Sequence, residues 1–507
     1  MNIREKRIIA RNVCFVAAFT SLLLAAPSHA VRVSTTGMGQ VLLFPYYTVQ
    51  NDNVSLISLV NTTAQGKAVR VNLRDARGGF VIGQLNVYLS AKDVWTAAIV
   101  GTGDDVRIIS NDRSCTAPLL YKTAGLPLTQ LAFTPPSGAA PGPSRESRRE
   151  GYVEVIEMAT IPNQTTTGIS ITHVRGAPAC NRGITDVATE PPASDLKAPS
   201  GGLTGTLSIV NPLQGMLVST AATALENFWL SGPGAAAPRV WPANASEPGL
   251  DSGGDRDAYL HAGSAFYAAN RSTAMARFAT SLDAVSAVLM TAVISSEYAT
   301  TTDNTIATTT VMTLPTKPYY IRRGNIGPFQ NAWSDATRQS CDDFAFSEYD
   351  REQGTGSRID DFPTRPPGPR NQLCYVANTI PVVLGTVTSS GYAIGGGAPD
   401  ASFLSAQFPF ALPSIQNGGL PVATPGREGG WLELAFTSAT ARLDAPDMTR
   451  VRITNGKPEI ATAAGIMYGL PAIGFTLSQS AFKQGSPQQN FADAVPLRTR
   501  PVLATTP

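Results

Sequence analysis

Four short runs of β-branched and aliphatic residues fill residues 53–100, and turn residues rather than a helical pattern separate them. Glycine stands in two of these turns, where it supplies the positive φ that tight connections need. Apolar and polar side chains alternate within residues 68–75 of this stretch: Val69, Arg70, Val71, Asn72, Leu73 and Arg74. This period of two predicts a strand with one dry face and one solvated face.

Four strands in so short a stretch predict an antiparallel β-sandwich of immunoglobulin-like size within a mainly β protein. We expect this N-terminal sandwich over residues 31–134, a linker rich in Pro, Gly and Arg over residues 135–150, and a larger β-rich part with a few short helices over residues 151–507. An alanine-rich helical insert is expected near residues 258–290. Pro45 interrupts the first strand, which predicts an edge position or a bulge because proline donates no backbone hydrogen bond.

The first thirty residues predict an export signal. Basic residues precede an apolar run over residues 13–26, and Ser28-His29-Ala30 fits a small-x-small cleavage site. The apolar run is too short to cross roughly 30 Å of hydrocarbon as a helix. We therefore expect an exported protein in the periplasm, on the outer surface or outside the cell, with no integral membrane segment once the signal is removed.

Four cysteines follow the predicted signal: Cys115, Cys180, Cys341 and Cys374. An even number of cysteines in an exported chain favours disulfides over metal ligation or catalysis. Three connectivities are possible, and we favour the pairing of sequence neighbours, Cys115 with Cys180 and Cys341 with Cys374.

The charge of the chain argues against nucleic-acid binding. Charged residues make up 15% of the chain, and 39 Lys and Arg against 37 Asp and Glu give a formal net charge of +2. Such a chain lacks the positive field that a phosphate backbone requires, so no nucleic-acid partner is expected.

The sequence offers little material for catalysis. Only His173 and His261 remain after the predicted signal, so a Ser-His-Asp or Cys-His group would have to use one of them. We interpret His173, in a strand-like stretch over residues 169–174, as a half-buried structural residue. No Gly-x-Ser-x-Gly elbow and no His-Glu-x-x-His motif is present. We therefore assign no catalytic residue.

Two further groups of residues are candidates for ligand binding. Asp251, Asp255 and Asp257 lie in a glycine-rich loop and offer the oxygen ligands that calcium prefers, with a solvated turn as the commoner explanation. No other cofactor is expected. Trp241 and Trp333 stand among polar or loop residues and are candidates for stacking on sugar rings, with core packing as the commoner role.

Several short motifs resemble those of an uncharacterised family of exported, β-rich proteobacterial proteins. They are Leu43-Phe-Pro-Tyr-Tyr-Thr-Val49, Val60-Asn-Thr-Thr63, Asn86-Val-Tyr-Leu-Ser90 with Asp93-Val-Trp-Thr-Ala97, Thr313-Leu-Pro-Thr-Lys-Pro-Tyr-Tyr320 and Tyr468-Gly-Leu-Pro-Ala-Ile-Gly-Phe475. The resemblance covers most of the chain after the signal. It implies export and a β-rich body, and it implies no activity, cofactor or site.

These observations leave two functional hypotheses. The first is a non-catalytic secreted or cell-envelope protein that acts through surface contacts in adhesion, assembly or scaffolding, with a cell-surface partner or a second copy of itself. The second is a protein that binds or acts on carbohydrate, using the loop tryptophans or a pair of carboxylates, with a glycan as its ligand.

Overall fold

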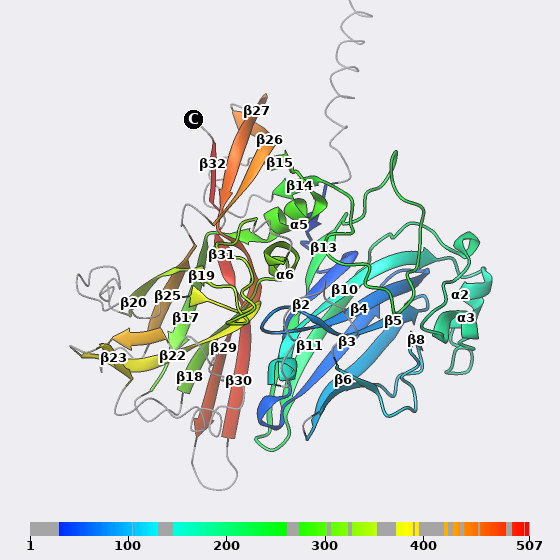
Figure 1. Ribbon diagram of the computed structural model, residues 1–507, viewed down its shortest axis with the longest axis horizontal. Coiled ribbons are helices and arrows are strands. Elements are labelled where there is room, and N and C mark those ends of the chain that lie inside the picture. The colour runs from blue at the N-terminus through cyan, green and yellow to red at the C-terminus, as the bar shows by residue number, and fades with distance from the viewer. Residues whose placement is uncertain are drawn as a thin grey trace, which may run out of the picture.

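The computed structural model describes most of the chain that follows the predicted signal (Figure 1). The described residues are 30–103, 105–129, 146–260, 273–301, 306–322, 327–351, 372–388, 391–394, 420–423, 429–436, 441–454, 457–482, 489–500 and 502–505. Residues 1–29 of the predicted export signal and His261 therefore lie outside the described residues. The fold is mainly β, which confirms the predicted class.

Two sheets form a sandwich in the N-terminal half of the chain, on the right of Figure 1. Sheet I has the order β1 (Arg32–Val33), β13 (Thr223–Glu226), β2 (Val41–Thr48), β10 (Glu150–Ile161), β4 (Gly66–Asp75), β5 (Val81–Leu89) and β8 (Cys115–Ala117). Sheet II has the order β12 (Met216–Ala221), β11 (Leu203–Asn211), β3 (Val54–Asn61), β6 (Val94–Thr102), β7 (Asp105–Ile109) and β9 (Leu126–Pro127). Phe44, Leu59, Val71 and Trp95 share one buried hydrophobic cluster, so the two sheets pack face to face.

The sandwich continues past residue 134, where we predicted its end. Strand β10 lies between β2 and β4 in sheet I, and β11 pairs with β3 in sheet II. Because these strands take interior positions, the sandwich is built from chain on both sides of the predicted linker at 135–150. They also give it more strands than the seven to nine of an immunoglobulin domain.

Pro45 lies at a bulge, one of the two positions predicted for it. Phe44 pairs with Val153 and Tyr47 pairs with Gly151, so the register shifts across Pro45. Strand β2 is an interior strand of sheet I, and the shift lets it hold a residue that cannot donate to the ladder.

The polar face of β4 is buried, so our prediction of a solvated face is wrong. Buried polar side chains of β4, β5 and β10 form a layer on this side of sheet I: Arg70, Asn72, Arg74, Gln84, Asn86 and Glu154. The segment 241–248 covers part of this buried polar layer. Arg70 donates to the carbonyls of Pro242 and Ala245 at 2.7 and 2.9 Å, and Asn72 donates to that of Pro248 at 3.2 Å.

An ion pair within sheet I completes the buried polar layer. Arg74 Nε lies 2.7 Å from Glu154 Oε2, and a second buried pair, Lys67 Nζ with Glu157 Oε1 at 2.6 Å, lies on the opposite side of the sheet. Tyr319, from the covering helix α6 (Lys317–Ile321), donates to Glu154 at 3.1 Å. Burial raises the pKa of Glu154, and Arg74 acts against that rise. The hydrogen bonds and ion pairs that these charged groups make thus offset the free-energy cost of removing them from water, as buried polar groups require.

The C-terminal half adds three larger sheets, on the left and at the top of Figure 1. Sheet III contains β23 (Gly391–Ile394), β22 (Ala377–Thr388), β18 (Ile306–Thr313), β29 (Ile473–Phe482) and β30 (Gln489–Pro496), with β24 (Leu420–Ala423) parallel to β22. Sheet IV contains β20 (Ala345–Asp350), β25 (Gly429–Ala435), β17 (Val293–Ala299) and β31 (Arg498–Arg500). Sheet V contains β14 (Asp257–Leu260), β15 (Thr273–Arg277), β26 (Arg442–Thr454), β27 (Lys457–Tyr468) and β32 (Val502–Thr505).

Two short strand pairs and a few helices complete the described fold. The pairs are β16 (Met290–Thr291) with β28 (Leu470–Pro471), and β19 (Asp342–Asp343) with β21 (Gln372–Leu373). Besides α6, the α-helices are α2 (Thr166–Ile171), α3 (Arg182–Thr185) and α5 (Ser281–Leu289). Sheet III joins the sandwich directly, because its Val311 and Phe475 belong to the same hydrophobic cluster as Phe44.

Within the described residues of the predicted helical insert near 258–290, α5 is the helix. Thr280 and Asp283 form a capping box, which fixes the start of this helix. Strands β14 and β15 pair through the buried residues Ala258 and Ala276, and residues 261–272 lie outside the described residues. Alanine favours helices by itself, but here its small side chain packs within a sheet, and the tertiary context prevails.

Candidate functional site

The outer face of sheet II is exposed and carries almost no charge. Its outward-pointing residues are Leu217, Ser219, Ala221, Thr204, Thr206, Ser208, Val210, Val54, Leu56, Ser58, Val60, Val94, Thr96, Ala98, Val100, Asp105, Arg107 and Ile109. Among them only Asp105 and Arg107, both on β7, are charged. Four of the large apolar members are well exposed: Leu56 by 41%, Val94 by 43%, Ile109 by 36% and Leu217 by 56%.

Strand register places these side chains in continuous rows. Ser219 on β12 pairs with Ser208 on β11, Ser208 with Leu56 on β3, Leu56 with Ala98 on β6, and Ala98 with Ile109 on β7. This row crosses five strands without a charged residue. A sheet face that carries aliphatic groups and hydroxyls but few charges is weakly hydrated. Wide exposed apolar patches of this kind mark interaction sites.

A pocket of about 500 Å³ lies between the turn after β5 and the end of α2. Ser90, Lys92, Asp93, Asn163, His173 and Val174 are among the residues that line it. Our prediction of a strand-like stretch over residues 169–174 is wrong, because α2 occupies Thr166–Ile171. The Thr165 side chain accepts the Gly168 N–H at 3.0 Å, which caps α2 and places His173 just beyond its end.

The polar groups of this pocket bond mainly to one another and to the backbone. His173 Nε2 lies 3.8 Å from Asp93 Oδ2. The same carboxylate oxygen accepts the Ser90 N–H at 2.9 Å and the Ser90 hydroxyl at 3.1 Å, and Lys92 donates to the Thr62 carbonyl. In a serine relay the hydroxyl bonds to the imidazole. Here it bonds to the carboxylate, so these three residues do not form that relay.

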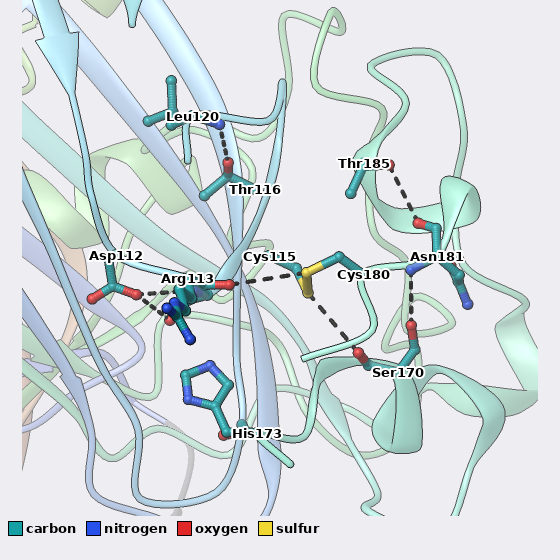
Figure 2. The surroundings of a disulfide bond; sticks show 12 residues. Asp112, Arg113, Cys115, Thr116, Leu120, Ser170, His173, Cys180, Asn181 and Thr185 are labelled. Carbon is teal, nitrogen blue, oxygen red and sulfur yellow. Dashed lines mark hydrogen bonds between the residues drawn. A yellow bond between two sulfur atoms is a disulfide. The ribbon is translucent and has the colours of Figure 1, made fainter. Parts of the chain in front are cut away.

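His173, which lines this pocket, belongs to the surroundings of the disulfide between Cys115 and Cys180 (Figure 2). This disulfide joins β8 of sheet I to the segment that follows α2, with a Cα–Cα distance of 5.4 Å. The Asn181 N–H donates to the Ser170 hydroxyl at 3.0 Å, which holds the two ends of this segment together (Figure 2). The second disulfide joins Cys341 to Cys374. The cysteines are therefore paired as sequence neighbours, the connectivity that we favoured.

Trp241 lies in the segment that covers the buried polar layer. Its ring stacks on Trp229 with centroids 5.7 Å apart, its Nε1 donates to Glu247 at 2.9 Å, and the Arg239 guanidinium lies 5.6 Å from its centroid. Arg70 and Asn86 bond to the backbone around it. These contacts give Trp241 a role in docking its own segment, and its predicted sugar binding stays a prediction.

Trp333 is also engaged by neighbours within the chain. Its ring meets Phe80 edge to face with centroids 5.7 Å apart, and the Arg322 guanidinium lies 3.6 Å from the Phe80 centroid. Burial lowers the pKa of Arg322 to about 10. Trp333 thus extends a packed aromatic and guanidinium stack at the edge of the C-terminal core, and its sugar binding likewise stays a prediction.

The structure does not gather the three aspartates proposed for calcium. Asp257 forms an ion pair with Arg277 at 3.2 Å, and Asp255 accepts the backbone N–H of Asp257 at 2.9 Å. Across the described ranges, no group of three or more His, Cys, Asp or Glu side chains is arranged to hold a metal ion. Calcium binding by Asp251, Asp255 and Asp257 stays an untested prediction.

Sequence reasoning missed the outer face of sheet II. In β3, apolar residues stand on both faces: Ile57 and Leu59 are buried, whereas Leu56 is exposed. A signal was present in the sequence: residues 54–61 lack a clear alternation of polar and apolar residues, whereas a strand with one solvated face normally shows this alternation.

No protein-family model, no curated protein and no solved structure matches this chain. The resemblance to uncharacterised exported proteins therefore stays a prediction. Among the helices of the described ranges, none has both the length and the apolar character needed to cross a membrane.

Proposed function

We propose that this is an exported, non-catalytic protein that acts through surface contact, and that the outer face of sheet II binds a second copy of the chain. The observation that carries this proposal is the run of exposed aliphatic and hydroxyl side chains across five strands. Exposed patches of this kind on a folded protein usually mark a binding surface.

The lack of charge on this face favours a second copy as the partner. Two copies that meet through the same patch bring identical residues close together, and identical charges would repel each other. Around Leu56 the neighbouring residues Ser208 and Ala98 are neutral, so this repulsion is absent. The serine and threonine hydroxyls can both donate and accept hydrogen bonds across such a contact.

Two features support export and contact rather than catalysis. The cysteines form two disulfides, which persist in oxidising compartments outside the cytoplasm. The Ser90 hydroxyl beside His173 donates to Asp93, which leaves the pocket without the hydrogen bond that activates a serine nucleophile.

Sedimentation of the purified chain after signal removal tests the proposal. We expect dimers or larger assemblies that dissociate in the Leu56→Lys variant, because two lysines would face each other at the centre of the contact. Leu119→Lys is the matched control, since Leu119 is 43% exposed and lies outside sheet II. A wild-type chain that stays monomeric at every accessible concentration overturns the proposal, as does equal dissociation in both variants.

A further inference from the structure

A second exposed surface lies on sheet IV, which shares no strand with sheet II. Tyr349 on β20 pairs with Trp431 on β25, and their rings stack with centroids 4.1 Å apart and planes at 12°. Trp431 still has 37% of its surface exposed. Leu432 and Leu434, on the opposite face of β25, are fully buried, so the aromatic pair stands on the outward side of the sheet.

Charged side chains border the aromatic pair on the same side of sheet IV. Glu297 on β17 pairs with Trp431 in the ladder, and Glu433 stands two residues after Trp431 on the same strand. Arg498 Nη1 lies 2.9 Å from Glu297 Oε1, and Arg500 Nη2 lies 3.4 Å from Glu433 Oε1. The Arg351 side chain lies over Gly429, on this same side of β25.

This combination suits a hydroxyl-rich ligand better than the apolar core of a protein interface. Protein interfaces place charged residues at the rim around a dry apolar centre. Here the carboxylates and guanidiniums stand directly beside the rings, and small residues such as Ala435 follow them along β25. An aromatic ring offers a flat apolar surface to the C–H face of a sugar, while carboxylates accept and guanidiniums donate hydrogen bonds to its hydroxyls.

We propose that Trp431, Tyr349, Glu297, Glu433, Arg498 and Arg500 form a saccharide-binding platform on the outer face of sheet IV. The aromatic pair supplies the stacking surface, and the carboxylates and guanidiniums of the two ion pairs form hydrogen bonds with the hydroxyls of the sugar ring. The platform shares no residue with the outer face of sheet II, so saccharide binding can be tested independently of self-association. It places the carbohydrate hypothesis on a tryptophan other than Trp241 and Trp333.

Affinity electrophoresis in gels that contain laminarin, hydroxyethylcellulose, xylan, chitosan or polygalacturonate tests this proposal. We expect at least one polysaccharide to retard the wild-type chain, and the neutral and charged polymers separate stacking from charge attraction. The Trp431→Ala variant should bind that polymer about tenfold more weakly or worse, because it loses the stacking surface. Glu297→Gln should weaken binding to a smaller extent, because an amide oxygen still accepts a hydrogen bond from a hydroxyl.

Phe491→Ala is the matched control, because Phe491 is an exposed aromatic residue on β30 of sheet III, with 61% of its surface accessible. It should bind like the wild type. Circular dichroism and thermal unfolding check that each variant is folded. The proposal is overturned if no polymer retards the wild type, or if Trp431→Ala binds as well as Phe491→Ala.

Discussion

The ammonium nitrogen of Lys317 lies 2.6 Å from Asp342 Oδ2, and both side chains are buried. Lys317 also donates to the carbonyls of Ser340 at 2.6 Å and Leu373 at 3.1 Å, the residues that precede the two cysteines of the second disulfide. Burial lowers the pKa of Lys317, and Asp342 acts against that decrease. One buried lysine thus ties helix α6 to both strands of the disulfide-bonded pair β19 and β21.

Replacing Lys317 by methionine should destabilise the fold by about 3–5 kcal/mol, because it leaves the buried Asp342 carboxylate without its counter-charge. Urea denaturation of wild type and variant measures the change. Lys197→Met, at an exposed lysine, should change the free energy of unfolding by less than about 0.5 kcal/mol. Equal effects of the two substitutions would contradict the role assigned to Lys317.

Removing the first disulfide with Cys115→Ser and Cys180→Ser should lower the free energy of unfolding by about 4 kcal/mol. The loop that it closes spans 65 residues, and the chain-entropy model assigns a loss of this size when such a loop is opened. Denaturation of the double variant measures it. Alkylation before reduction offers a separate check, and modification of any of the four cysteines in the denatured, unreduced chain would show that the pairing is wrong.

Arg70→Met should loosen the segment 241–248 from sheet I. The substitution leaves the Pro242 carbonyl and the Asn86 side-chain oxygen without the Arg70 donor, at about 1–3 kcal/mol for each buried group, whereas Gln84 still donates to the Ala245 carbonyl. Amide hydrogen exchange should rise in this segment. Arg107→Met, on the exposed face of sheet II, is the control and should leave exchange there unchanged. Unchanged exchange in Arg70→Met would show that other contacts hold the segment.

The Glu150 carboxyl should make the fold less stable as the pH rises. Burial raises its pKa above the ordinary value of 4.5, while the Tyr46 hydroxyl, which donates to it at 2.7 Å, acts against the rise. Between the ordinary and the raised pKa, the folded chain holds a proton that the unfolded chain has lost. This contribution to stability is therefore present at low pH and falls as the pH increases through that window.

The variant Glu150→Gln removes this titration and keeps an oxygen that accepts from Tyr46. The free energy of unfolding of the variant minus that of the wild type should be larger at neutral pH than at about pH 4, below the ordinary pKa of glutamate. Urea denaturation at both pH values provides the comparison. The same difference between variant and wild type at both pH values would contradict the raised pKa.

Local patterns predicted much of the architecture. The runs in residues 53–100 became β3, β4, β5 and β6, because β-branched residues closed by glycine turns favour strands wherever they lie. The even number of cysteines favoured two disulfides, and both formed. The bulge at Pro45 followed from the missing N–H of proline. Each of these outcomes depends on residues that are close in the chain or on a chemical property of one residue type.

The candidate sites depended on distant partners, and local patterns did not reveal them. Trp431 lies in a strand, and only the fold shows that Tyr349 and Glu297, distant in the sequence, lie beside it on the same face of sheet IV. Trp241 and Trp333 lie in loops, which suggested exposure, yet each packs on another aromatic ring.

The sequence by itself determined that this chain forms strands with two distinct faces, and that its cysteines have partners. Only the tertiary structure decided which face is covered. The charged face of β4 is buried because the segment 241–248 and helix α6 bring it hydrogen-bonding partners, whereas the aliphatic and hydroxyl face of sheet II lies open to solvent. Alternation assigns side chains to faces, but burial depends on segments more than a hundred residues away, and a period of two carries no information about them.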